Sequence, residues 1–425
     1  MAAWAVGTLA ALAAAPSGAA AEATLVEAIA QGKPLIDLRA RYEQVDDDAV
    51  ANTGKAGTVR ARLGYETGAW NGLSALFEFD FTRGIGGENY NSTRNGKATY
   101  GLVADPDVTE LNRLQLTYAG PFDTRAIVGR QRIILGNARF IGNVGWRQHE
   151  QTFDALTLIN TAVPDTTLTY VYVAGVNRIF GDDTPVPNAA TGAPAVGHYD
   201  SDSHLINAGY AGLPHLKLEG FAYLLDLEQS GTPATGTPAA RNSTATYGLR
   251  ADANFTLGAG VTAAFAGQYA NQSDYADNPL PIDLDYWLAE GSLGYAGATF
   301  GVGYESMEGD GTVGFSTPLA TLHAFAGWAD KFLTTPVDGL DDRYARLAYT
   351  TDAVPVFTKT TAALVYHDFE AERTGADLGS EWDASLDLVL DANVSFNAKY
   401  ATYRGTGAPG LLDKDVFWLS ATYKY

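Results

Sequence analysis

The chain has no cysteine, which excludes disulfide scaffolds and metal sites built on thiolates. Basic residues are scarce, because 28 Lys and Arg stand against 49 Asp and Glu, so no overall positive field favours nucleic acid. Beyond the N-terminus, the sequence lacks the apolar runs of roughly 18 residues that membrane helices need. Aromatic residues are 11% of the chain, which argues against intrinsic disorder. A folded protein that is not a helical membrane protein remains.

The N-terminal segment is apolar and built from small residues. Residues 1–21 carry no charged side chain, and small residues Ala19–Ala21 precede Glu22. This arrangement predicts a secretory signal peptide over residues 1–21, although a membrane anchor or a buried helix is the alternative. Residues 22–33 are predicted to form a periplasmic lead-in with a short helix, and residues 34–425 to form one domain.

Downstream of Pro34, apolar and polar residues alternate with the period of a β-strand. In residues 36–43, for example, Leu38 and Tyr42 fall on one face, whereas Arg39 and Arg41 fall on the other. The segments span roughly nine to twelve residues, which matches a tilted membrane-spanning strand. Short connections alternate with long ones, as in bacterial outer-membrane barrels. The two cancelling faces of such a wall explain a mean hydropathy of −0.09.

The pattern predicts an all-β fold, a single antiparallel transmembrane barrel with short periplasmic turns and long extracellular loops. We expect eighteen strands, at about 35–43, 58–67, 73–82, 109–118, 124–132, 152–160, 167–175, 204–210, 215–226, 244–256, 261–271, 284–294, 298–306, 342–350, 358–369, 380–390, 394–403 and 415–425. Sixteen is the alternative, because the segments at 124–132, 152–160 and 204–210 are weakly patterned. In the first, outward Ala126 and Val128 would also turn Arg130 and Arg132 outward, unless a bulge intervenes or the strand ends by Gly129.

Charge is distributed unevenly. Acidic residues gather in the predicted outer loops, where solvated charge or divalent cations bridging lipopolysaccharide are both possible interpretations. Most arginines lie before residue 150, and several fall on the polar strand face. An arginine ladder inside a barrel favours anions, but arginines paired with carboxylates could equally brace the wall. The predicted pore-lining residues are Arg39, Arg41, Arg60, Arg62, Arg113, Arg125, Arg130, Arg132, Arg139, Arg147, Arg250, Asp37, Glu78 and Asp80.

Two stretches are distinctive, Gly129–Ala155 with its Gly145-Trp146-Arg147-Gln148-His149 core and Thr317–Leu333 with Gly327-Trp328-Ala329-Asp330. Together with the lead-in Gly32–Arg39, they resemble the alginate-export family of outer-membrane barrels. The resemblance implies a monomeric eighteen-stranded barrel whose electropositive lumen is narrowed by inward loops at 130–151 and 317–330. Candidate constriction residues in these loops are Trp146, His149, His323, Trp328 and Asp330, although hydrogen-bonded structural histidines are the alternative.

No nucleophile-elbow, P-loop or zinc-protease motif is present, and the six histidines lack ligand-like spacing, so we predict no enzyme, cofactor or metal. The predicted function is passive diffusion of small hydrophilic, preferentially anionic solutes across the outer membrane of a Gram-negative bacterium. Export of an anionic polysaccharide such as alginate is the alternative, and a lipid-modifying barrel enzyme is a further one. Expected partners are outer-membrane lipids, lipopolysaccharide and small or oligosaccharide solutes, with no nucleic acid.

Overall fold

The structure, a computed structural model, describes residues 24–181, 186–187, 194–228 and 240–425. The predicted signal peptide at 1–21 lies outside these ranges. Helix α1 (Leu25–Ala30) begins with a capping box between Thr24 and Glu27. Its Ala28 carbonyl accepts a hydrogen bond from the Gly68 amide at 2.8 Å, which ties the helix to the turn after the second strand. The short helix predicted in the lead-in is therefore confirmed.

Long strands make up most of the remaining chain. The first barrel strands are β1 (Lys33–Asp47), β2 (Gly54–Glu66), β3 (Leu73–Asn89), β4 (Val108–Ala119), β5 (Thr124–Gln131), β6 (Thr152–Asn160), β7 (Thr166–Asn177), β10 (His198–Leu213) and β11 (Leu216–Leu224). The others are β13 (Thr244–Gly258), β14 (Val261–Asp274), β15 (Asp283–Tyr295), β16 (Ala298–Met307), β17 (Leu340–Thr351), β18 (Lys359–Glu370), β19 (Asp377–Val389), β20 (Val394–Arg404) and β21 (Lys414–Lys424). Short elements in loops are β8 (Val186–Pro187), β9 (Pro194–Ala195), β12 (Leu227–Glu228), η1 (Ala240–Asn242) and η2 (Leu322–Ala324).

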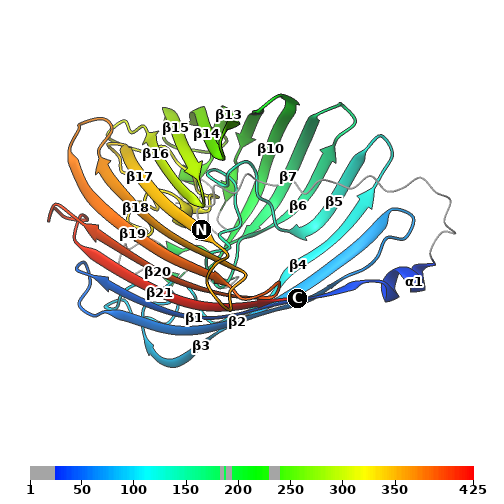
Figure 1. The fold of residues 1–425 in the computed structure, drawn as a ribbon, viewed down its shortest axis with the longest axis horizontal. Coiled ribbons are helices and arrows are strands. Elements are labelled where there is room, and N and C mark those ends of the chain that lie inside the picture. Colours follow the sequence, from blue (N-terminus) through cyan, green and yellow to red (C-terminus); the bar gives the residue numbers. More distant parts are fainter. Residues whose placement is uncertain (1–23, 182–185, 188–193, 229–239) are drawn as a thin grey trace.

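The strands form one closed antiparallel barrel. Each long strand pairs with its neighbours in sequence, and β1 pairs with β21 over Asp37–Asp47, so that blue and red strands lie side by side in Figure 1. The two-residue β12 adds to β10 beside β11. The barrel has 18 strands, which confirms the predicted number over the alternative of sixteen, and the three weakly patterned segments are strands. Helix α1, where the described residues begin, and the C-terminal Tyr425 both lie at the short-turn side.

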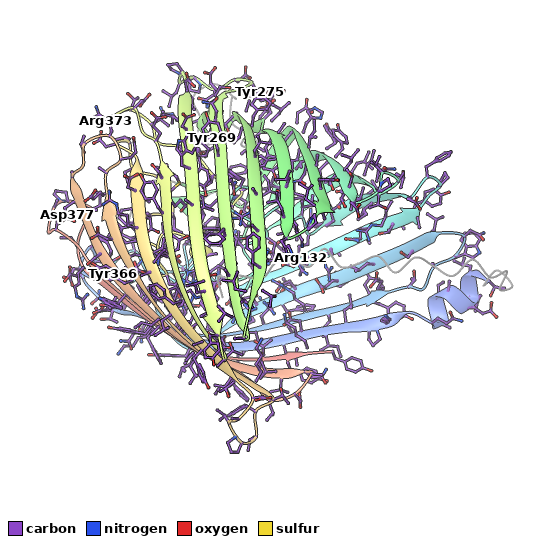
Figure 2. All side chains as sticks on the ribbon, turned by 45° about the horizontal axis from the view of Figure 1, so that its top comes forward. Arg132, Tyr269, Tyr275, Tyr366, Arg373 and Asp377 are labelled. Atoms are coloured by element: carbon purple, nitrogen blue, oxygen red, sulfur yellow. The ribbon has the colours of Figure 1, made fainter. Side chains whose placement is uncertain are left out.

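The outer wall is apolar, with aromatic side chains on its surface. Tyr269 on β14 packs on Trp287 with ring centroids 4.3 Å apart, and Tyr366 on β18 packs on Trp382 at 4.9 Å (Figure 2). Trp287 and Trp382 are each about half exposed, because they point away from the lumen. Such a band is what a lipid-facing surface requires. Among the described residues, no helix is long and apolar enough to cross a membrane.

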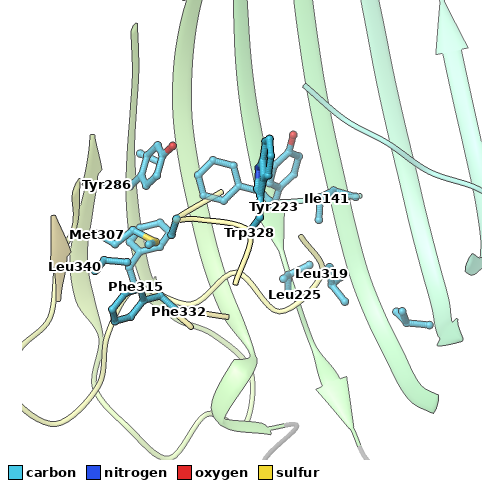
Figure 3. Packing of buried hydrophobic residues seen from close by; sticks show 14 of the residues in the cluster. Ile141, Tyr223, Leu225, Tyr286, Met307, Phe315, Leu319, Trp328, Phe332 and Leu340 are labelled. Carbon is cyan, nitrogen blue, oxygen red and sulfur yellow. The ribbon is translucent and has the colours of Figure 1, made fainter. Parts of the chain in front are cut away.

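The lumen contains an apolar core of its own (Figure 3). Long loops fold inward and place Phe140, Phe315 and Trp328 among wall residues such as Tyr286. The Phe140 ring lies 5.2 Å from that of Tyr286 and 5.9 Å from that of Phe315. Burying a large apolar side chain is worth about 1.5–3 kcal/mol, so this core holds the loops inside the barrel.

Gly129 lies in β5 against the backbone of β4, where it leaves no room for a side chain. Its φ is +114°, and a Cβ atom would lie 2.2 Å from the Leu114 carbonyl oxygen. We expect Gly129→Ala to cost about 2 kcal/mol or more in unfolding free energy, because both the backbone conformation and the contact are unfavourable. Urea unfolding in detergent micelles tests this. Gly209→Ala in β10, where a Cβ meets nothing within 4 Å, is the matched control and should be nearly neutral.

Candidate functional site

Two inward loops occupy the lumen and are joined to each other. The first inward loop (132–151) follows β5, and the second inward loop (308–339) follows β16. The Gly142 amide donates to the Leu319 carbonyl at 2.8 Å, and the Thr321 amide donates to the Ala138 carbonyl at 3.0 Å. The Gln151 side chain also reaches the Leu319 carbonyl at 3.1 Å. The two loops therefore form one body, in the positions that the resemblance implied.

The predicted arginine ladder is present on β1 and β2, with Arg39 directly opposite Arg60. Its members bind the first inward loop. Arg39 donates to the Trp146 carbonyl at 3.0 Å, Arg41 to the same carbonyl at 2.7 Å, and Arg62 to the Gln148 carbonyl at 2.9 Å. Peptide carbonyls are neutral acceptors, so these contacts position the loop and leave the guanidinium charges in place.

Carboxylates pair with arginines of the ladder and with other arginines of the wall. Arg62 binds Asp80 at 2.7 Å, and Arg113 binds Glu78 through two hydrogen bonds of 2.9 and 2.8 Å. Arg60 binds Asp37, and Arg250 on the far wall binds Asp252 at 2.8 and 2.6 Å. The lumen is thus not purely basic, because the predicted lining carboxylates Asp37, Glu78 and Asp80 pair with arginines there, as the bracing alternative expects.

Glu150 is the one carboxylate of the first inward loop, and several side chains bind it. It is fully buried and accepts from Arg132 Nε at 2.8 Å, from Asn112 at 2.8 Å and from Asn143 at 2.6 Å. Arg62 Nη1 lies 3.3 Å away. Burial alone would raise the pKa of Glu150, but the charges of Arg62 and Arg132 outweigh burial and hold it well below its ordinary value.

His149 lies between two carboxylates. Its Nδ1 is 3.5 Å from Asp80 and its Nε2 is 3.0 Å from Glu110. Burial alone would lower the pKa of His149, but the interactions with Asp80 and Glu110 prevail and raise it to about 9. At neutral pH this histidine is therefore a cation that joins the loop to β3 and β4.

The second inward loop is held by a lysine in an aromatic cage. Lys399 of β20 lies 3.8 Å from the Trp328 ring centroid and 4.2 Å from that of Trp146. Its Nζ is 2.8 Å from His323 Nε2, and His323 Nδ1 is 2.8 Å from Asp330. The His323 and Trp146 rings stack at 4.4 Å. On β19, Asp383 accepts from the Trp328 amide at 3.1 Å and Glu381 from the Ala329 amide at 2.7 Å.

The other predicted loop arginines are also paired. Arg139 binds Glu305 at 2.6 Å and lies 4.8 Å from the Phe325 ring centroid. Arg147 joins β1 to the second inward loop, because it binds Glu43 at 3.1 Å and Asp330 at 3.1 Å. Four of the five constriction candidates, Trp146, His323, Trp328 and Asp330, gather around Lys399, whereas His149 lies apart between Asp80 and Glu110. These side chains are buried or half-buried and hold the loops in place.

Arg130 is a correction to the predicted pore lining. Strand β5 continues to Gln131, and Arg130 is the cross-strand partner of Leu114, whose side chain points outward and is 53% exposed. Alternation continues through Gly129, so Arg130 lies on the outer wall, where it binds Asp154 at 2.8 Å. Arg132 follows the strand end and turns inward to Glu150. Arg125 shares the inward register of Gln131, and its Nε makes no hydrogen bond with the described residues.

Several site residues were missed by the sequence reasoning. Glu43, Lys399 and Lys424 lie on inward positions of their strands, so alternation could have identified them. Asp105 and Glu150 come from loops, and no periodic signal marks them. Asp105 is fully buried, accepts from the Gln148 amide at 2.8 Å and lies 3.8 Å from Arg41.

A cationic strip, defined as Arg39, Arg60, Arg62, Arg132 and Lys424, runs along the inner wall at the β1–β21 closure. Lys424 is close enough to Arg39, Arg60 and Arg132 for their charges to interact. Within the described part of the chain, these five cations form ion pairs with three carboxylates, Asp37, Asp80 and Glu150, and Arg39 forms none. The Lys424 and Arg132 side chains are 63% and 32% exposed, so water reaches these two members of the strip, whereas Arg60 and Arg62 are buried.

No group of three His, Asp or Glu side chains is arranged to hold a metal ion within the described ranges. Divalent cations are one of two interpretations of the acidic outer loops. That interpretation stays a prediction, because two of the acidic residues concerned, Asp182 and Asp183, fall outside those ranges.

No protein-family profile matches the sequence, and no curated protein matches it. Solved structures do match across the barrel. OccAB4 of Acinetobacter baumannii is 16% identical with a TM-score of 0.70, over 93% of this chain and 98% of that chain. OpdK of Pseudomonas aeruginosa, solved with vanillate, is 14% identical with a TM-score of 0.68, over 93% and 99%. OpdL of P. aeruginosa is 18% identical with a TM-score of 0.64, over 93% and 99%.

These matched structures are outer-membrane porins rather than enzymes. They support a bacterial outer-membrane barrel for this chain, but they do not support the alginate-export family that the loop motifs suggested. At these identities the likeness shows the fold, which is the eighteen-stranded barrel of Gram-negative outer-membrane channels.

Proposed function

We propose that the protein is a passive outer-membrane channel that prefers small anionic solutes, among them carboxylates and sugar acids. The observation that carries this proposal is the cationic strip, whose five cations form ion pairs with only three carboxylates and whose Lys424 and Arg132 are accessible to water. A solute carboxylate gains by replacing water at Arg39 and Lys424, and several weak sites in succession allow it to leave again. The barrel closes within one chain, so no second copy is needed to complete its wall.

The preference can be measured with the double variant Arg39→Gln with Lys424→Gln. In planar bilayers under a salt gradient, we expect the anion-over-cation permeability ratio to fall roughly fivefold, because one unit charge at about 4 Å is worth about 1 kcal/mol even in water. Arg343→Gln is the control, since Arg343 lies on the outer wall with a 48% exposed side chain. An unchanged ratio in the double variant contradicts the selectivity proposal. Competition with uronates, neutral sugars and aromatic acids then identifies the solute class.

Export of an anionic polysaccharide is the second candidate function. The same cationic strip would attract a polyanion, but a polymer needs a continuous wide path, and the two joined inward loops lie in the lumen. The solved structures that match give this candidate no support. Conductance block by a long uronate polymer from either side, at lower concentration than by the monomer, would favour it.

A further inference from the structure

The lipid-facing wall has a groove of about 750 Å³ across the β1–β21 closure. Its floor consists of small residues, Ala40, Gly57, Ala398 and Ala421, and its lining also includes Tyr42 and Phe396. Tyr42 and Phe396 are 38% and 39% exposed, which places them on the outer wall. The lumen and its charged residues lie on the other side of the same strands, so this groove is separate from the cationic strip.

Strand register explains why the wall is hollow there. Ala40 on β1 is the partner of Ala421 on β21, and Ala421 is also the partner of Phe396 on β20. Gly57 on β2 lies opposite Tyr42. Four small residues on neighbouring strands therefore leave a trough, and larger residues line its edges. The trough crosses several strands, so it runs obliquely across the membrane band.

An apolar trough inside the membrane band must be filled by apolar groups, since water gains nothing there and a void loses van der Waals contacts. A second copy of the chain is a poor occupant. A two-fold interface would place this patch against itself, so that trough would face trough and leave a larger void. A flexible acyl chain, in contrast, conforms to an irregular concave surface.

The two ends of the trough distinguish which lipid supplies the chain. Leu388 and Phe396 lie near the short-turn ends of β19 and β20, which is the periplasmic side. Next to this end, Tyr423 and Tyr425 are exposed at the level of lipid headgroups. On the long-loop side, Asp415 of β21 is paired with Arg404 at 2.9 Å, but Asp46 of β1 forms no ion pair with the described residues and is followed by Asp47 and Asp48, so this side repels the phosphates of lipopolysaccharide.

We propose that this groove binds one acyl chain of a periplasmic-leaflet phospholipid and retains it more firmly than the surrounding lipids. The chain lies over Ala40, Ala398 and Ala421, with Tyr42 and Phe396 along its sides. The proposal concerns the outer wall, so it stands or fails independently of solute selectivity in the lumen.

The test is to extract the full-length barrel from membranes in mild detergent and count bound lipids by native mass spectrometry. Wild-type protein should retain one more phospholipid per barrel than Ala398→Trp, whose indole fills the trough. Ala253→Trp on β13 is the matched control, because Ala253 lies on the outer wall beside Phe265, away from the groove, and it should retain the wild-type number. If Ala398→Trp does not fold, Ala421→Leu fills the trough with less volume and should also lose the lipid.

Three results would overturn the proposal. The filled variant could keep the wild-type number of phospholipids, the retained species could have the mass of lipopolysaccharide, or wild-type barrels could appear as dimers that Ala398→Trp dissociates. A difference of one phospholipid between Ala398→Trp and Ala253→Trp, with both proteins monomeric, supports it.

Discussion

Replacing Glu150 by Gln is expected to release the first inward loop and to lower the unfolding free energy by about 3 kcal/mol or more. Glu150 is fully buried and binds Arg132, Asn112 and Asn143, with Arg62 at 3.3 Å. Gln has nearly the same shape, so packing is retained while the negative charge is lost. Both guanidinium groups then remain in a poorly solvated site with less compensation, which is the costly way to break a buried ion pair.

The same change should also alter permeation. Removing one carboxylate beside Arg132 adds a net positive charge next to the cationic strip. We therefore expect Glu150→Gln to raise the anion-over-cation permeability ratio, the opposite of the Arg39→Gln with Lys424→Gln result. Conductance should become noisier, because a loosened loop moves in the lumen.

Asp154→Asn is the matched control for this prediction. Asp154 pairs with Arg130 on the outer wall, and both side chains are partly exposed, so loss of the pair should cost less than about 1 kcal/mol. Urea unfolding followed by tryptophan fluorescence measures both variants. Equal losses for Glu150→Gln and Asp154→Asn would show that the buried network is not what holds the loop.

The barrel was predictable from sequence because a membrane wall imposes a simple period on each strand. Phe77, Phe79 and Phe81 must face lipid, and Glu78 and Asp80 must then face the lumen, whatever the rest of the chain does. Most strand ends follow from this rule to within four residues, but β3 continues seven residues beyond its predicted end and β10 begins six residues before its predicted start. The same rule places Arg130 on the outer face, and the prediction that it lines the pore required a bulge or a strand end at Gly129, whereas β5 continues in register to Gln131.

The candidate site was only partly predictable, since periodicity says which way a side chain points and not what it meets. Arg39 and Arg41 were correctly placed on the inner face, but their partners are peptide carbonyls of a loop that is more than a hundred residues away. Lys399 was on the polar face of its strand, yet only the fold brings it between Trp146 and Trp328. The paired arginines hold the loops, as the bracing interpretation expects, and the excess charge of the cationic strip supports the selectivity proposal.

Acidification is expected to unlatch the second inward loop through His323. This histidine is buried, and burial is the main reason that its pKa is lowered to about 3. The positive charge of Lys399 lowers the pKa further, whereas the negative charge of Asp330 raises it. Neutral His323 donates Nδ1–H to Asp330 and accepts from Lys399, whereas the protonated ring would place two cations 2.8 Å apart. Arg147, which also contacts Asp330, adds a further positive charge.

The sign follows from comparison with an unfolded chain, in which a histidine titrates near 6.5. Between about pH 6.5 and pH 3 the unfolded chain binds a proton that the native site refuses, so stability is full above 6.5 and declines as the pH falls. The loss reaches several kcal/mol, since each pKa unit corresponds to about 1.4 kcal/mol. His149 acts oppositely: its pKa is raised to about 9, so its contribution is full below 6.5 and is lost as the pH rises towards 9.

Two histidine variants separate these effects. His323→Gln keeps one donor for Asp330 and one acceptor for Lys399 but cannot be protonated, so it should flatten the decline in stability between pH 6.5 and about 4.5, below which the lumen carboxylates lose their contribution in both proteins. His149→Gln should flatten only the decline between pH 6.5 and pH 9. Limited proteolysis of the two loops across this range, together with urea unfolding, measures both. If wild-type protein and His323→Gln lose stability in parallel from pH 6.5 downwards, the His323–Lys399 contact does not control the acid response. Protonation of lumen carboxylates such as Glu150 and Asp330 would then be what releases the loops.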